Sequence, residues 1–223
     1  MADTNFKSST ASTPPVHGDG RQQINFLVIG NSITQHGIGE YWWGLWGMAA
    51  TQKSNDFVHV VANYLSKNFD VKFDIFNFFQ WELMHYDRAE TLAMLNKFHG
   101  KNYDFIVIQL GENVNNSDTF EKDFFELIKN IREKISAGAK IFVVGNFWRN
   151  ELVDFIKFKI SLMTGSFFVN LMDIQSAEFA IGTGVEVFGD DGKKHLVTHN
   201  GVAKHPNDKA MRICAERILH ALH

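Results

Sequence analysis

Three polar side chains that could carry out acyl transfer lie far apart in the sequence, each beside a turn. Ser32 lies in the segment GNSIT, directly after an apolar run. Asn113 follows a second apolar run, and His205 begins the segment HPND ahead of a helical pattern. A hydroxyl nucleophile, a neutral imidazole base and an amide donor to an oxyanion are the groups that acyl transfer needs.

The elements that must position these side chains are short apolar strands separated by helical patterns. Five apolar runs predict strands, at residues 24–29, 71–76, 105–110, 141–144 and 167–169. Apolar spacing of three and four predicts helices over 55–68, 92–98, 119–135 and 207–222. Ser54, Asp118 and Asn207 are the expected N-caps, and Gly138 ends the third helix.

This alternation predicts an α/β protein, a three-layer α/β/α sandwich around a mainly parallel five-stranded sheet. The run 105–110 is apolar at nearly every position, which is typical of a strand buried on both faces. In such sheets ligands bind beyond the carboxyl ends of the strands, where Ser32 and Asn113 are expected to lie. Residues 185–197 predict a hairpin over that rim.

The composition indicates one folded domain over residues 24–223, preceded by a disordered tail or linker over residues 1–23. The tail has no apolar core typical of a signal peptide, and no segment is long and apolar enough for a membrane span. The compartment and the oligomeric state stay open. The net charge of -3 gives no reason to expect a nucleic acid partner, and the single cysteine, Cys214, is expected in the core.

Taken together and in this order, the three segments resemble the SGNH (GDSL-type) hydrolase superfamily. GNSIT at 30–34 stands for the family's Gly-Asp-Ser block, GENV at 111–114 for Gly-x-Asn-Asp, and HPN at 205–207 for the final block. The resemblance covers residues 24–222. It implies a flavodoxin-like fold, with Ser32 as nucleophile and His205 as base in the hydrolysis of an acyl or acetyl ester.

The chain departs from the family pattern at three places. Asn31 replaces the aspartate beside the serine, and we expect a small effect. The loop 77–82 lacks the family's oxyanion-hole glycine, so we assign the second backbone donor to Gln80, beside the N–H of Ser32 and the side chain of Asn113. Val202 stands where the family has the acid of the triad.

The missing acid leaves two arrangements open. A backbone carbonyl that accepts from Nδ1 of His205 would still select the required tautomer, giving a Ser-His dyad that is slower than a triad. Alternatively, an acid from elsewhere completes a triad, and the candidates are Glu112, Asp173, Glu186 and Asp191. A neutral imidazole with an ordinary pKa predicts that activity falls as the pH drops through about 6–7.

Aromatic side chains near the expected rim are candidates for substrate binding. Trp42, Trp81 and Trp148 follow the first, second and fourth predicted strands, and flat rings suit sugars and acyl chains. The alternative is that they fill the core. His36, four residues after Ser32, lies either on the rim or on the open surface.

No cofactor is predicted. His195, His199 and His205 crowd one stretch with Asp190 and Asp191, but their spacing matches no common zinc pattern. No Gly-x-Gly-x-x-Gly segment or phosphate loop is present.

The sequence therefore predicts a serine esterase acting on a small acyl ester, with an acylated carbohydrate as the first choice of partner and no nucleic acid or membrane. Two alternatives stay open, a non-catalytic carbohydrate-binding protein on the same fold and an O-acyltransferase.

Overall fold

The computed structural model describes residues 20–222, so most of the expected tail at residues 1–23 lies outside the described residues. Five strands form one sheet in the order β2-β1-β3-β4-β5, and all neighbouring pairs are parallel. The strands are β1 (Gln23–Gly30), β2 (Asp70–Asn77), β3 (Phe105–Gln109), β4 (Lys140–Val144) and β5 (Phe167–Val169). This order is the flavodoxin-like one, and the predicted sandwich is confirmed.

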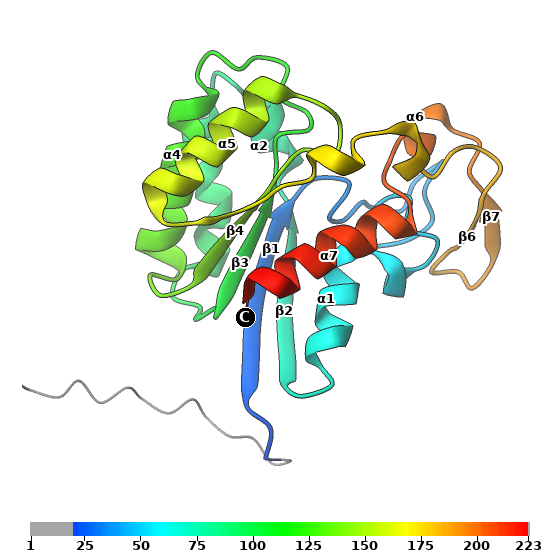
Figure 1. Ribbon diagram of the computed structural model, residues 1–223, viewed down its shortest axis with the longest axis horizontal. Coiled ribbons are helices and arrows are strands. Elements are labelled where there is room, and N and C mark those ends of the chain that lie inside the picture. The colour runs from blue at the N-terminus through cyan, green and yellow to red at the C-terminus, as the bar shows by residue number, and fades with distance from the viewer. Residues whose placement is uncertain (1–19, 223) are drawn as a thin grey trace, which may run out of the picture.

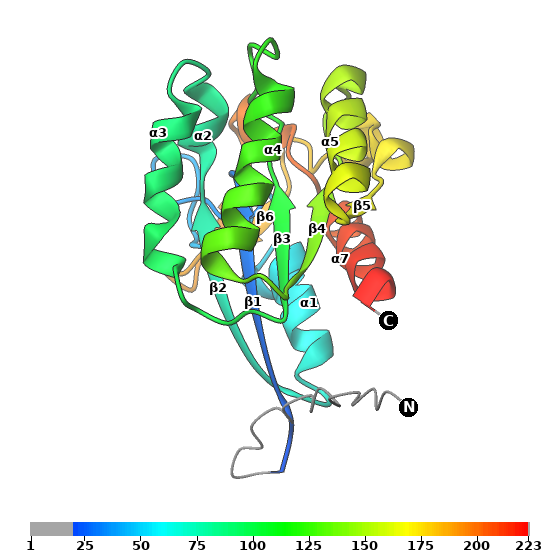
Figure 2. The same cartoon turned by 90° about the vertical axis from the view of Figure 1, so that its left-hand side faces the viewer.

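Helices cover both faces of the sheet (Figures 1 and 2). One face carries α1 (Phe57–Leu65) and α7 (Asp208–Leu222). The other carries α4 (Phe120–Asn130) and α5 (Glu151–Thr164), with the shorter α2 (Phe79–Leu83) and α3 (Arg88–Thr91). Single-turn α6 (Asn200–Ala203) and a two-stranded hairpin of β6 (Glu186–Phe188) and β7 (Lys194–Leu196) lie between β5 and α7 in the chain. The predicted helix over 92–98 is a 3₁₀ helix, Leu92–Phe98. Within residues 20–222, no helix combines the length and apolarity needed to cross a bilayer.

The strand β1 shows why the sheet is buried on both faces. Phe26 and Val28 belong to the core cluster under α1 and α7, whereas Leu27 and Ile29 belong to the cluster under α4. All four are at most 1% exposed. Successive side chains of a strand alternate between faces, so continuous apolar runs are stable only between two layers.

The N-cap residues of two helices differ from the predicted ones. Asp56, rather than Ser54, caps α1 and accepts a hydrogen bond from the N–H of His59 at 2.7 Å. Thr119, rather than Asp118, holds the cap position of α4, without a side-chain bond. Asn207 caps α7 as predicted, accepting from the N–H of Ala210 at 3.0 Å.

Four helices lie outside the predicted ranges. They are α2, which begins in the loop 77–82, the short α3 and α6, and the 14-residue helix α5 after β4. The predicted hairpin is confirmed, and it packs on the segment that follows Ser32 through stacking of His195 on Trp43, with ring centroids 4.5 Å apart. Cys214 is buried in the core as expected.

Candidate active site

The carboxyl ends of three neighbouring strands are in register. Gly30 of β1 pairs with Asn77 of β2 on one side and with Gln109 of β3 on the other. The three turns that follow, which carry Ser32, α2 and Asn113, therefore leave the sheet at the same edge. This register is the reason that the segments carrying Ser32 and Asn113 lie at one edge of the sheet, as predicted.

The turn that carries Ser32 is built from backbone bonds around Asn31. The Asn31 carbonyl accepts from the N–H groups of Thr34 and Gln35, both at 3.0 Å, and its side-chain oxygen accepts from Ile33 N–H at 3.0 Å. Gly30 is required because a Cβ there would lie 1.9 Å from Oγ1 of Thr34. A short polar residue that bonds to its own following backbone stabilises such a turn.

Ser32 and His205 meet across 173 residues of sequence. The Ser32 Oγ lies 2.9 Å from Nε2 of His205, which is within the reach of proton transfer. On the other side of the ring, Nδ1 lies 2.9 Å from the carbonyl oxygen of Gly201. A carbonyl can only accept, so Nδ1 carries the proton and Nε2 is left free to accept the Ser32 hydroxyl.

Of the two arrangements left open for His205, the structure shows the backbone carbonyl, and Gly201 provides it. Each of the four candidate acids has other partners. Asp173 pairs with Arg217, Glu186 with Lys194 and Asp191 with His195, while Glu112 accepts from the backbone of residues 147 and 148. The triad alternative is therefore wrong for this structure. Val202 is 1% exposed and packs in the core.

The environment of His205 favours its neutral form. Burial lowers the pKa of His205 to about 4, with the nearby His36 and His199 acting in the same direction and the Gly201 carbonyl acting against them. His205 as a whole is 9% exposed. The prediction of an ordinary imidazole pKa is corrected here, because removal from water penalises the charged imidazolium.

A buried carboxylate joins the Ser32 turn to Asn113. Oε1 of Glu82 accepts from Nδ2 of Asn31 at 3.2 Å and from the N–H of Gly111 at 2.5 Å, while Oε2 accepts from Nδ2 of Asn113 at 2.7 Å. Glu82 is 1% exposed, and burial raises its pKa despite these donors. Gly111 has a φ of +124°, and a Cβ there would lie 2.7 Å from Oδ1 of Asn146.

An asparagine at position 31 fits this arrangement. An amide at position 31 donates to the Glu82 carboxylate, whereas a second carboxylate there would repel it. No spacing pattern in the sequence points to Glu82, which lies in α2, a helix that was not predicted.

A second carboxylate, that of the partly buried Glu112, fixes the loop after β4. It accepts from the N–H of Phe147 at 2.5 Å and of Trp148 at 3.1 Å. Burial raises the pKa of Glu112, and the charge of Lys157 acts against that shift. The loop places the Trp148 ring edge-on to His205, with centroids 4.9 Å apart, and the indole N–H donates to the Lys204 carbonyl.

A cavity of about 270 Å³ opens onto the Ser32–His205 pair. Its walls include His36, Tyr41, Phe79 and His199, and Tyr41 stacks on His199 with centroids 4.3 Å apart. Of the two positions considered for His36, the structure shows the one at the rim. Tyr41 directly precedes Trp42, and His199 lies in the histidine-rich segment, so both were within reach of sequence reasoning.

The tryptophans predicted to bind substrate do not line this cavity. Trp42 and Trp81 are both 0% exposed and pack in the two core clusters on opposite faces of the sheet. A side chain without exposed surface cannot contact a ligand, so these two predictions are corrected in favour of the core alternative. Trp148 is partly exposed and supports His205.

The other predicted site residues are placed as follows. Gln80 lies in the first turn of α2 with an exposed side chain, beside Phe79 of the cavity wall. His195 stacks on Trp43, whereas His199 stacks on Tyr41, so these two histidines have different aromatic partners. In the described part of the chain, no three histidine, cysteine or acidic side chains converge as metal ligands would.

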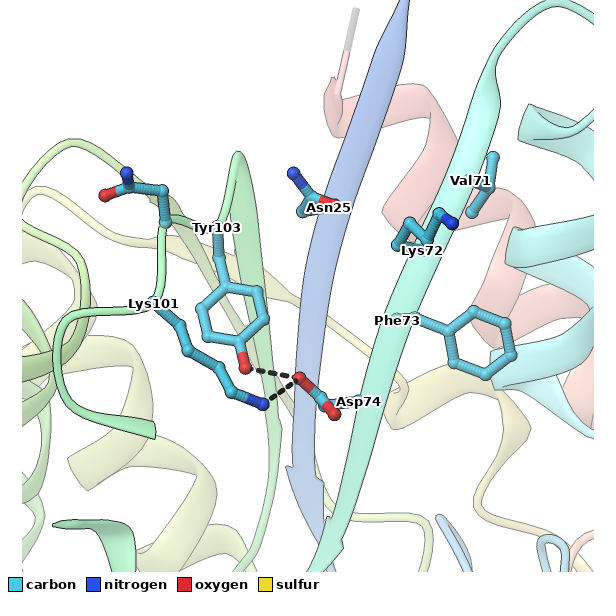
Figure 3. Close-up of a pocket in the computed structure, with 8 residues that line it drawn as sticks. Asn25, Val71, Lys72, Phe73, Asp74, Lys101 and Tyr103 are labelled. Carbon is cyan, nitrogen blue, oxygen red and sulfur yellow. Dashed lines mark hydrogen bonds and ion pairs between the residues drawn. The ribbon is translucent and has the colours of Figure 1, made fainter. Parts of the chain in front are cut away.

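A larger hollow, about 670 Å³, lies toward the opposite end of the sheet (Figure 3). There Asp74 accepts from the Tyr103 hydroxyl at 2.6 Å and from Lys101 at 2.9 Å. Burial raises the pKa of Asp74, but these donors outweigh it and the net shift is downward. The hollow is open and its lining includes no serine, threonine, cysteine or histidine, so it is not the candidate active site.

Comparison with known proteins gives matches in structure alone. No family model matches the sequence, and no curated protein matches it. A GDSL-like lipase from Bacteroides uniformis superposes with a TM-score of 0.56 over 90% of this chain and 96% of its own, at 13% identity. An acetyl xylan esterase from Geobacillus stearothermophilus gives 0.54, covering 88% and 93%, at 14% identity.

A family two carbohydrate esterase from Clostridium thermocellum superposes with a TM-score of 0.53 over 89% of this chain, at 14% identity. The present chain spans 63% of the length of that esterase. These structural neighbours confirm the fold that the SGNH resemblance implied. At such low identity the likeness concerns the fold, and the function has to be argued from the site.

Proposed function

We propose that this chain is a serine esterase that hydrolyses a small acyl ester through a Ser32–His205 dyad. The observation that supports this most strongly is the 2.9 Å separation of Ser32 Oγ and His205 Nε2, at the mouth of a cavity and at the carboxyl edge of a parallel sheet. The tautomer selected by Gly201 leaves Nε2 as the acceptor, which is the state a general base requires.

The proposed reaction has two halves. Ser32 Oγ attacks the carbonyl carbon while its proton passes to His205 Nε2, and the tetrahedral intermediate then expels the alcohol, which takes that proton. Water repeats the sequence on the acyl-serine, losing its proton to Nε2 and releasing the acid as Ser32 recovers its hydrogen. Each step keeps one proton shuttling between the reacting oxygen and the imidazole.

The oxyanion is held by the backbone N–H of Ser32 and by the side chain of Asn113. One hydrogen of the Asn113 amide is bound to Glu82, which fixes the plane of the amide and leaves the second hydrogen to donate. A third donor from the backbone at Gln80 is part of the same proposal.

The substrate proposed is an acetyl or similarly short ester, with a carbohydrate as the first choice of alcohol. The cavity of about 270 Å³ has room for a short acyl group, and stacked Tyr41 and His199 offer a flat face at its rim. Structural neighbours include an acetyl xylan esterase and a carbohydrate esterase in complex with cellohexaose.

The test is hydrolysis of p-nitrophenyl acetate and of acetylated xylan by the wild type and the Ser32→Ala variant. Wild-type turnover that is lost in the variant supports the proposal, and acetate released from the polymer supports the carbohydrate substrate. Equal turnover by both proteins, or none by the wild type, contradicts the esterase. The second result would favour the carbohydrate-binding alternative, and acyl transfer to added sugar in place of water would favour the acyltransferase.

A further inference from the structure

The helix α5 exposes large apolar side chains on its outer face, and its inner face buries polar side chains beside the apolar Val153, Ile156 and Ile160. Its inner face buries Asp154, Lys157 and Ser161, which are at most 5% exposed. Its outer face consists mainly of Leu152, Phe155, Phe158, Leu162 and Met163, which are between 44% and 67% exposed. A surface helix normally directs its polar side chains outward, as the neighbouring α4 does.

The inner polar side chains have partners that explain their burial. Nζ of Lys157 donates to the Leu110 carbonyl at 2.9 Å, and Asp154 accepts from the N–H of Asn146 at 2.7 Å. Burial lowers the pKa of Lys157, against the opposing charge of Asp154. The core thus accounts for the inner face of α5, and nothing within residues 20–222 covers its outer face.

The exposed apolar surface extends from α5 onto the edge of the sheet. Phe167 of β5 and Met172 are 43% and 57% exposed, and a hollow of about 640 Å³ separates them from Phe155 and Leu162. We call these two residues and the five apolar residues of the outer helix the α5 face. At about 200 Å² for a large apolar side chain, the α5 face exposes on the order of 800 Å².

That area exceeds the largest apolar patch of a typical monomer, about 300–600 Å². It equals the share of one partner in a standard protein interface, about 800 Å². The charges beside it are already paired, Lys159 with Glu121 at 2.6 Å and Arg149 with Glu151. The α5 face therefore has no excess charge to select an acidic or basic partner or an anionic membrane.

We propose that the α5 face binds a second copy of this chain in a two-fold symmetric dimer. A neutral apolar surface is complementary to itself, and a two-fold axis places the same residues opposite one another. Phe155, Phe158 and Leu162 follow the spacing i, i+3, i+7 of a helix-packing seam. Phe158 lies near the middle of α5, so an antiparallel pair of these helices brings it beside its own copy.

This proposal is independent of the esterase proposal, because no residue of the α5 face lines the cavity at Ser32. The dimer leaves that cavity open.

The experiment is sedimentation velocity on the full chain between about 1 and 100 µM. The wild type is expected to sediment with twice the mass of the chain at tens of micromolar, since interfaces of this size bind at micromolar affinity or tighter. A Phe155→Glu/Leu162→Glu variant is expected to be monomeric with an unchanged circular dichroism spectrum. The control is Tyr86→Glu, which places one such charge on an exposed aromatic residue outside the α5 face and is expected to stay dimeric.

A second variant gives a result that does not depend on that double substitution folding. Under mild oxidation, Phe158→Cys is expected to form a covalent dimer, whereas Tyr86→Cys is expected to stay monomeric on a denaturing gel. A wild type that is monomeric at 100 µM, or a dimer that survives the double substitution, overturns the proposal. A monomer that floats with phosphatidylcholine vesicles also overturns it and assigns the α5 face to lipid.

Discussion

The Nδ1 atom of His205 lies 2.9 Å from the carbonyl oxygen of Gly201, the position at which a Ser-His-Asp triad would have a carboxylate. The carbonyl fixes the same tautomer that a carboxylate would, but it carries no full charge to stabilise the imidazolium. The proposed base therefore keeps its orientation and loses an electrostatic contribution to proton uptake.

The pH profile of ester hydrolysis follows from this difference. Since the pKa of His205 is lowered to about 4, the imidazole stays neutral down to that pH, and kcat/KM for an uncharged ester is expected to fall only near pH 4. The measurement is kcat/KM between about pH 3.5 and 8 with an acetate ester. An acid limb centred at pH 6–7 would mean that His205 is solvated, or that another group is the base.

Asn113 and Glu82 are expected to act as one unit in the transition state. Asn113→Ala removes an oxyanion donor and is expected to lower kcat about 100- to 1000-fold with little change in KM. Glu82→Gln puts a donor beside the Asn113 amide and is expected to lower kcat about tenfold, the effect of one misaligned hydrogen bond.

The double variant separates a positioning role of Glu82 from a general structural one. If Glu82 acts through Asn113, adding Glu82→Gln to Asn113→Ala lowers kcat no further. Glu121→Gln, at an exposed glutamate of α4, is the control and should match the wild type. Independent losses that multiply would contradict the positioning role.

The backbone at Gly111 provides a test based on stability. Gly111→Ala is expected to destabilise the protein by about 2–3 kcal/mol, because φ is +124° and the added Cβ would lie 2.7 Å from Asn146 and 2.9 Å from Val153. Gly138→Ala is the matched control, since a Cβ there meets nothing within 4 Å and φ is not positive. Urea denaturation measures both, and equal stabilities would show that Gly111 is not strained by a side chain.

The parts of this molecule that the sequence predicts are those with a simple repeat or a local signal. Residues 26–29 of β1 and 105–108 of β3 are apolar without interruption, so a sheet covered on both faces follows directly. Ser32 and His205 were recognisable because each stands beside a distinctive turn segment. The distance between their side chains could not be predicted from the sequence. It depends on the backbone hydrogen bonds of residues 179–182 that hold the histidine loop, including the one from Ile181 N–H to the His205 carbonyl.

The parts that the sequence does not predict depend on tertiary partners. Helix α5 was missed because Asp154 and Lys157 point inward and Phe155 and Leu162 outward, which removes the amphipathic signal. Trp42 and Trp81 were predicted to bind substrate because the sequence near a strand end does not distinguish an aromatic side chain that faces the core from one that faces the rim. The role of Glu82 is visible only in the structure, where two turns far apart in the sequence, at Asn31 and at residues 111–113, donate to its carboxylate.

The central claim is that His205 makes Ser32 a nucleophile, and covalent labelling tests it most directly. The wild type, Ser32→Ala and His205→Asn are each treated with a fluorophosphonate, and intact-mass and peptide spectra locate the adduct. We predict one adduct on Ser32 in the wild type, none in Ser32→Ala, and labelling slowed by orders of magnitude in His205→Asn. A wild-type Ser32 that stays unlabelled, or one that reacts equally fast without the imidazole, would contradict the claim.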